Sequence, residues 1–140
     1  MVMVRHHNNG FVHTSEEVEL FCEEIKDCLE MGVKGLVFGG ITEGKEIDEG
    51  MMKRVVKEVN TSKVDVTFHK AFDQVNNVVK AYDQLSELGI NRVLTQGGQK
   101  PILENTDALK QIIEKSKTAH KTKVLLGGGI TFDNIKQTLA

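Results

Sequence analysis

The sequence has little of what would mark a membrane, secreted or nucleic-acid-binding protein. It contains no run of about 18 apolar residues and no basic run, so it predicts no membrane span and no nucleic-acid surface. Its first residues, MVMVRHHNNG, are too short and too polar for a signal peptide. The 140 residues carry a formal net charge of −2, with 27% charged residues, which is typical of a globular chain. We therefore expect one domain over residues 1–140 and a cytoplasmic location.

Cysteine and proline are also scarce. Cys22 and Cys28 fall in one expected helix, about 120° apart around its axis, so they are poorly placed to pair with each other. Their spacing matches no standard zinc pattern, and we expect ordinary helix residues. Pro101 is the only proline and lies in an expected loop, so it interrupts no element.

The chain instead alternates short apolar runs with amphipathic segments. Strands are expected at 1–5, 35–40, 64–69, 91–98 and 122–129, and helices at 14–32, 47–60, 74–89, 104–120 and 130–140. Thr14 with Glu17 predicts a capping box, Gly32 a helix stop, and Asp48 and Thr131 predict N-caps. Strands joined by helical crossovers indicate an α/β fold with a parallel sheet. Length alone favours an open doubly wound sheet over a closed (β/α)8 barrel, which takes about 250 residues.

Glycine-rich turns follow the last two expected strands, at the carboxyl ends where both architectures place ligands. The GGGIT turn (127–131) predicts backbone N–H groups that approach an anion in front of a helix N-terminus; it is also compatible with a tight turn alone. TQGGQ (95–99) is a weaker candidate for the same role. The residues expected to bind an anion are Gly127, Gly128, Gly129, Thr95, Gly97 and Gly98.

VTFHKAFD (66–73) is an apolar strand that ends on ionisable residues. Alternation along a strand places Thr67 and His69 on one face and Phe68 on the other, with Lys70 pointing away from His69. His69 is the candidate acid or base, since an imidazole that titrates near neutrality suits that role. Asp73 is expected to cap the next helix, and it could also orient His69.

The first expected strand ends in Arg5, His6 and His7. Arg5 is expected either in a structural ion pair or as a ligand for an anion, because a guanidinium at the end of a buried strand needs a carboxylate or phosphate partner. His6 and His7 are adjacent and would point to opposite faces of a strand, so we expect a solvated loop rather than a shared metal site.

Six motifs coincide in order and spacing over essentially the whole chain and resemble the CutC family of copper-homeostasis proteins: VMVR, HTSEE, GLVFGGIT, VTFHKAFD, RVLTQGG and GGGIT. The resemblance implies a (β/α)8 TIM-barrel fold and replaces the open sheet that length favoured. Family members are longer, so about five βα units, resembling the third to seventh, are expected here as a partial barrel. Such a truncated product or fragment would expose sheet edges and could self-associate as a homo-oligomer.

The chain departs from the family pattern at several positions. The family's RPRGGDF reads RHHNNGF here, so Arg5 is kept while His7 replaces the second arginine and Gly10 the aspartate. HRAFD has Lys70 in place of arginine, and TSGG has Gln96 in place of serine. Loss of the second arginine would weaken an anion site, because histidine and lysine lack its planar fork.

Three hypotheses follow from the residues and the resemblance. The first is a copper-homeostasis protein that binds copper. The family's proposed copper cysteines lie on an early part of the barrel, so no copper role is carried to Cys22 or Cys28, and the histidines available are His6, His7, His13, His69 and His120. The second is an enzyme acting on a small phosphorylated or carboxylated metabolite, with His69, Asp73 and Arg5 as its catalytic residues. The third is an inactive barrel fragment.

Overall fold

The strands and helices alternate along the chain as the sequence predicts. The structure is a computed structural model that describes residues 1–6, 8–118 and 122–139. Two short 3₁₀ helices, η1 and η2, follow β3 and β4. The elements are β1 (Val2–Met3), α1 (Ser15–Glu30), β2 (Gly35–Phe38), α2 (Glu49–Glu58), β3 (Asp65–Phe68), η1 (Lys70–Gln74), α3 (Val78–Glu87), β4 (Arg92–Thr95), η2 (Ile102–Glu104), α4 (Thr106–Thr118), β5 (Lys123–Leu126) and α5 (Ile135–Leu139).

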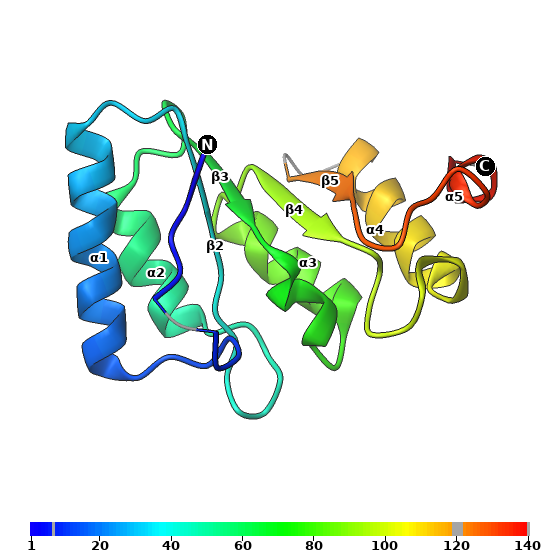
Figure 1. Cartoon of the computed structure of the whole chain (residues 1–140), viewed down its shortest axis with the longest axis horizontal. Coiled ribbons are helices and arrows are strands. Elements are labelled where there is room, and N and C mark those ends of the chain that lie inside the picture. Colours follow the sequence, from blue (N-terminus) through cyan, green and yellow to red (C-terminus); the bar gives the residue numbers. More distant parts are fainter. Residues whose placement is uncertain (7, 119–121, 140) are drawn as a thin grey trace.

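The five strands form one parallel sheet in the order β1-β2-β3-β4-β5 (Figure 1). Their register places Val37 opposite Thr67, and Thr67 opposite Arg92. Each strand lies beside the one before it in sequence, whereas a doubly wound sheet reverses its strand order at a switch point. The open doubly wound sheet that length favoured is therefore wrong, and the partial (β/α)8 barrel is confirmed.

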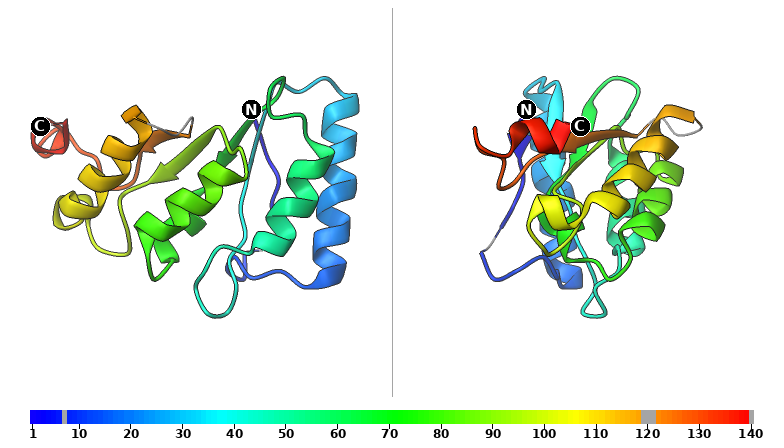
Figure 2. Two further views of the ribbon diagram at one scale, coloured as in Figure 1. Left: turned by 180° about the vertical axis from the view of Figure 1, so that it is seen from behind. Right: turned by 90° about the vertical axis from the view of Figure 1, so that its right-hand side faces the viewer.

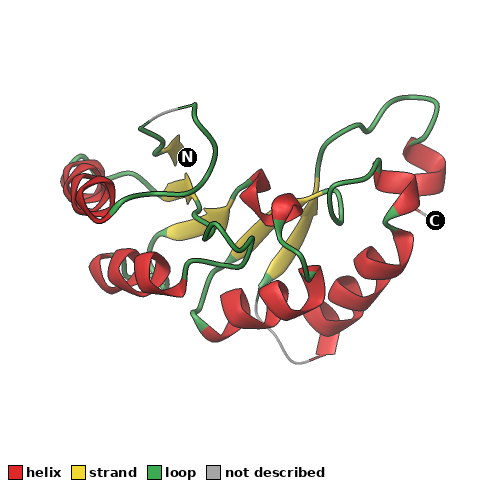
Figure 3. Cartoon of the chain, turned by 90° about the horizontal axis from the view of Figure 1, so that it is seen from below, coloured by secondary structure: helices red, strands yellow, loops and turns green. Residues whose placement is uncertain are grey.

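Helices α1 to α4 lie in an arc along one face of the sheet (Figure 3). Right-handed crossovers between successive parallel strands place every connecting helix on the same side. The last segment leaves the end of β5 at the opposite end of the sheet from α1 (Figure 2). One face of the sheet is thus covered by helices while the other remains open.

The predicted helix starts for α1 and α2 are present. Thr14 and Glu17 form the capping box: the Thr14 N–H donates to Glu17 Oε2 at 2.7 Å and the Glu17 N–H donates to Thr14 Oγ1 at 3.2 Å. Asp48 caps α2 by accepting from the Met51 N–H at 2.9 Å. Gly32 follows α1 with a φ of 75°, a conformation that glycine adopts at little cost.

The expected helix at 130–140 is mostly absent. Helix α5 covers only Ile135–Leu139. The Asn134 side chain accepts from the Thr131 N–H at 2.8 Å and donates to the Gly129 carbonyl at 2.7 Å. The Ile135 N–H also donates to the Thr131 carbonyl at 3.0 Å, so residues 130–134 form a turn that leads into the short helix α5.

The core lies between the sheet and its helices. Alternate strand residues point toward the helices, and their neighbours on α1 to α4 enclose them completely. The fully buried large side chains are Tyr82, Phe21, Phe38, Phe68, Phe72, Ile25, Leu36, Met52, Leu85, Ile90, Ile112 and Val55.

The opposite face of the sheet carries exposed apolar side chains. Met1, Met3 and Leu125 are 66%, 58% and 47% exposed. Parallel sheets normally have both faces covered, and in a closed barrel this face would point into the interior. We call these three residues the open face.

Two smaller expectations concern cysteines and membranes. Cys22 and Cys28 are both free thiols, as their helix geometry predicts. Within the described ranges, no helix combines the length and apolar character needed to cross a membrane.

Candidate functional site at the carboxyl end of the sheet

A cavity of 450 Å³ lies above the carboxyl ends of the central strands. Its walls come from the segments that follow β1, β2, β3 and β4, the end at which parallel α/β folds bind ligands. The lining residues are Phe11, Lys45, Lys70, Asp73, Gln74, Gln96, Gly98 and Gln99. Of the site residues predicted from sequence, only Asp73 and Gly98 line it.

Asp73 links the end of β3 to the turn after β4. Its Oδ1 accepts from the Thr95 hydroxyl at 2.5 Å, the Gln96 N–H at 3.1 Å and the Gly98 N–H at 3.2 Å. The sequence predicted that Asp73 would cap the next helix, and this prediction is wrong. Asn77 caps α3 instead, through its Oδ1. Nor does any recorded hydrogen bond join Asp73 to His69 among the described residues.

The TQGG turn holds an anion, but that anion is the chain's own carboxylate. Besides the Gly98 N–H that donates to Asp73, the Gly97 N–H donates to Thr95 Oγ1 at 2.8 Å. Both glycines have positive φ values, 92° for Gly97 and 144° for Gly98, which let the backbone curl around the carboxylate. These amide groups are already satisfied within the protein.

The GGGIT turn is also arranged differently from the expectation. The Gly127 N–H donates to the Thr95 carbonyl at 2.9 Å and so extends the sheet rather than facing a ligand. At Gly128 (φ 113°), any Cβ would overlap Lys70 Nζ and Gln96 Oε1. Helix α5 begins at Ile135, six residues after Gly129, so its N-terminus does not directly follow the three glycines.

His69 is enclosed at the end of β3, with 4% of its surface exposed. Its Nδ1 accepts from the Ala71 N–H at 3.2 Å and caps η1, which assigns the ring proton to Nε2. Burial, and next the Arg5 guanidinium, lower the pKa of His69 to about 4. The imidazole is therefore neutral at pH 7, and the expected near-neutral titration is wrong.

Arg5 and His69 both contact the ring of Phe11. The Arg5 guanidinium carbon lies 4.7 Å from the centre of the Phe11 ring, a cation–π distance. The Phe11 and His69 rings lie 4.9 Å apart. Phe11 lines the cavity while Arg5 and His69 do not, so these two predicted residues sit behind one wall of it.

Lys70 lines the cavity, although the sequence did not identify it as a site residue. Strand β3 ends at Phe68, so its alternation does not extend to Lys70, which begins η1. The Lys70 ammonium lies 2.7 Å from Gln96 Oε1 and 3.5 Å from Asp73 Oδ2, on the cavity wall. The two departures from the family pattern on this rim, Lys70 and Gln96, thus contact each other.

His6 is not in a solvated loop, although the sequence led us to expect one. The His6 side chain is 10% exposed, its Nδ1 lies 3.1 Å from Glu24 Oε1, and its ring packs edge-on against Phe21 with centroids 4.7 Å apart. The strand ends before His6, and the loop folds its ring onto α1. His7 and His120 lie outside the described residues.

Metal-donor side chains are scattered over the part of the chain that the structure describes. There, no three His, Cys, Asp or Glu side chains are grouped so that they could hold a metal ion. His6 and His13 both lie edge-on to Phe21, with His13 at 5.3 Å between ring centres.

A parallel sheet that advances one strand at a time, with helices on one face and a cavity above its carboxyl ends, defines a partial (β/α)8-barrel protein. The CutC family model matches residues 1–140, and the chain belongs to the CutC family.

Individual relatives agree with this assignment. The copper homeostasis protein cutC homolog of Mus musculus is 36% identical over 138 residues, covering 99% of this chain and 49% of that protein. The Homo sapiens homolog is 35% identical with the same coverage. The crystal structure of CutC from Streptococcus agalactiae superimposes with a TM-score of 0.83 at 28% identity, covering 97% of this chain and 65% of that one. The chain thus spans about half the length of the curated relatives that it matches.

Proposed function

We propose that this chain acts in copper homeostasis. The observation that carries the proposal is the CutC family match over residues 1–140, together with mammalian relatives named for that role. A cytoplasmic site of action is part of the same proposal, and cell fractionation with an antibody to the chain would test it.

The genetic test is copper tolerance. The gene that encodes this chain, expressed in a bacterium whose own CutC gene is deleted, should restore growth on copper to the level of the parent strain. Asp73→Ala should restore it less, because the Asp73 carboxylate ties the β3 and β4 ends together. Copper sensitivity that stays unchanged on expression of correctly folded protein would contradict the proposal.

Direct copper binding is a separate question within this proposal. Imidazoles suit Cu(II), and His6 and His13 are the donors to test first because both rings lie against Phe21. Titration calorimetry with Cu(II) and Cu(I) should give stoichiometric heat that the double variant His6→Ala and His13→Ala removes. If the chain restored copper tolerance but gave no binding heat, its role in copper homeostasis would not depend on copper binding by His6 and His13.

A second candidate function is an enzyme that acts on a small phosphorylated or carboxylated metabolite. The cavity at the carboxyl end of the sheet favours it, since its volume lies in the range of small-molecule sites and two lysines line it. His69, Arg5 and Asp73 adjoin this cavity and remain the proposed catalytic residues. Because the His69 imidazole is neutral, the part we propose for it is that of a hydrogen-bond donor through Nε2–H rather than that of a positive charge.

The test is turnover of metabolites that stabilise the protein in a thermal-shift screen. His69→Asn keeps an acceptor for the Ala71 N–H and removes the Nε2–H, so it should abolish turnover while leaving the fold intact. Turnover that survives this change would remove His69 from the mechanism. The third candidate, an inactive fragment, predicts a broad unfolding transition and no ligand at all.

A further inference from the structure

Two cationic side chains, Lys45 and Lys70, line the cavity at the carboxyl end of the sheet. We propose that Lys45 and Lys70 bind the anionic group of a small carboxylate or phosphate ligand in this cavity, with Gln96 holding the Lys70 ammonium in place. The proposal rests on the second candidate function and names the residues that hold the anionic group of its ligand. It places the anion-binding site at the loops after β2 and β3, whereas the sequence led us to expect it at Arg5 and the 127–131 turn.

The charge of the cavity wall favours an anion. Asp73 is the only carboxylate among the residues found to line it. Its oxygens already accept from the Thr95 hydroxyl and from the N–H groups of Gln96 and Gly98. Asp73 Oδ2 also lies 3.5 Å from Lys70 Nζ, so the two lysines and one carboxylate among the lining residues give the wall a net positive charge.

Gln96 fixes the position of Lys70 without neutralising it. The Gln96 Nε2 donates to the Lys100 carbonyl at 2.9 Å, which turns Oε1 toward Lys70 Nζ at 2.7 Å. An amide oxygen is a neutral acceptor, so the ammonium keeps its charge and retains protons for a ligand. Gly128 leaves room for this arrangement, because any side chain there would overlap both Lys70 Nζ and Gln96 Oε1.

Hydrogen bonds fix the loop that carries Lys45 at the rim of the cavity. It is the only non-glycine residue with positive φ in residues 1–6, 8–118 and 122–139, at 56°. Its N–H donates to the Thr42 carbonyl at 2.9 Å, and its carbonyl accepts from the Asn76 N–H at 3.0 Å. The Asn76 side chain also donates to the Gly44 carbonyl at 2.8 Å. A strained conformation that several bonds hold in place is typical of functional loops.

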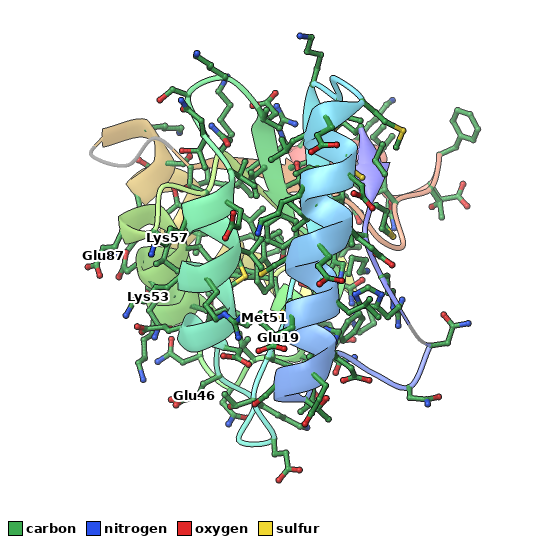
Figure 4. All side chains as sticks on the ribbon, turned by 90° about the vertical axis from the view of Figure 1, so that its left-hand side faces the viewer. Glu19, Glu46, Met51, Lys53, Lys57 and Glu87 are labelled. Carbon is green, nitrogen blue, oxygen red and sulfur yellow. The ribbon has the colours of Figure 1, made fainter. Side chains whose placement is uncertain are left out.

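Other lysines close to this loop have carboxylate partners. Lys53 lies 2.8 Å from Glu49, and Lys80 lies 2.9 Å from Glu46. Figure 4 shows Lys53 on the outer side of α2 and Glu46 on the loop below it. By contrast, no ion pair of Lys45 is found among the described residues. The Lys45 ammonium is thus available to a ligand.

The rest of the wall fits a compact polar metabolite. Gln74 and Gln99 add neutral amide groups that can orient a ligand, and Phe11 supplies one apolar surface. Polar groups on a concave wall fix the orientation of a small ligand. Lysine binds phosphate and carboxylate alike as a point charge, so the structure defines the anionic group and leaves the two ligand types to experiment.

The test is an NMR titration of the ¹⁵N-labelled full chain with inorganic phosphate and, separately, with succinate. We expect shifts at Gln96, Gly98 and Gln99 with a Kd of about 1–10 mM for the preferred probe. Lys45→Gln and Lys70→Gln should each weaken that Kd about tenfold, and Lys70→Arg should preserve most of it. The matched control is Lys63→Gln, because Lys63 precedes β3 and lies at the amino end of the sheet, away from the cavity.

A second variant keeps the proposal testable without removing either charge. Gly128→Ala should displace the Lys70 ammonium and weaken binding as Lys70→Gln does, while the signals of the core remain in place. The preferred probe shows whether the anionic group is a phosphate or a carboxylate.

Three results would overturn the proposal: no shift at these residues up to about 50 mM of either probe, full binding by both lysine variants, or equal weakening by Lys63→Gln. Lysine-dependent binding without turnover of any metabolite would instead leave the proposal standing and remove the enzymatic part of the second candidate function.

Discussion

The Thr95 hydroxyl donates a hydrogen bond to Asp73 Oδ1, with 2.5 Å between the two oxygens, although the residues are 22 positions apart in sequence. This contact joins the segment after β3 to the end of β4. It gives both partners a role different from the one that sequence suggested. Asp73 serves as the internal anion of the β4 turn, and Thr95 as a donor to it rather than to a ligand.

The first prediction concerns Asp73. Asp73→Ala should lower the free energy of unfolding by about 2–4 kcal/mol, because the Thr95 hydroxyl and the Gln96 and Gly98 N–H groups would lose a charged acceptor. Urea denaturation followed by circular dichroism measures this change. Asp133→Ala, at an exposed position, is the control and should change stability by less than about 0.5 kcal/mol. Equal effects of the two variants would mean that the carboxylate contributes nothing special.

The second prediction concerns the pH dependence of stability. The pKa of His69 falls from its ordinary value of 6.5 to about 4 on folding, chiefly through burial. Between pH 6.5 and 4 the unfolded chain binds a proton at His69 that the folded chain does not bind. The free energy of unfolding is therefore unaffected by the titration of His69 above pH 6.5 and decreases as the pH falls toward 4. The limiting loss is about 3 kcal/mol.

Denaturation at a series of pH values tests it against His69→Asn. Asparagine can still accept from the Ala71 N–H but does not titrate, so the variant should show a smaller drop in stability between pH 6.5 and 4 than the parent chain. Carboxylates titrate in both proteins and cancel in the comparison. Parallel curves for the two proteins would contradict the lowered pKa.

The third prediction compares two glycines with similar backbone angles. Gly97 has a φ of 92° and Gly10 a φ of 101°. At Gly97 a Cβ would lie 2.6 Å from Leu109 Cγ and 2.8 Å from Asn105 Cβ, whereas at Gly10 it would meet nothing within 4 Å. Gly10→Ala should therefore cost about 1–2 kcal/mol from the backbone alone.

Gly97→Ala should cost about 1–3 kcal/mol more, because overlap with packed atoms adds to the backbone term. Chemical denaturation of both variants gives the difference directly. If the two variants were equally stable, the turn after β4 would have to be looser than its contacts indicate.

The fourth prediction concerns the open face. Met3 and Leu125 are exposed on the uncovered side of a parallel sheet, and apolar surface of this kind favours association. We expect the chain to self-associate at micromolar concentration, and Met3→Glu with Leu125→Glu to reduce the mass seen by analytical ultracentrifugation. Met31→Glu is the control, because Met31 is 76% exposed but follows α1 on the helix side. A monomeric parent chain would contradict this expectation.

The sequence by itself was sufficient for features that depend on neighbours along the chain. The order of strands and helices follows from apolar periodicity, and the caps at Thr14 and Asp48 follow from side chains that reach N–H groups three residues away. The family motifs added the barrel, which neither length nor periodicity could distinguish from a doubly wound sheet. The helix expected at 130–140 was too long, because residues 130–134 form a turn in which Asn134 bonds to Thr131 and Gly129.

Only the tertiary structure decided which polar groups meet at the carboxyl end of the sheet. Asp73 reaches the turn after β4, and Lys70 reaches Gln96, because β3 and β4 lie side by side; periodicity along either strand carries no information about that distance. The neutral state of His69 likewise depends on enclosure by residues remote in sequence, which strips the imidazole of water and disfavours its charged form. The sequence therefore determined the end of the sheet at which the candidate site lies, and packing between strands determined which side chains compose it.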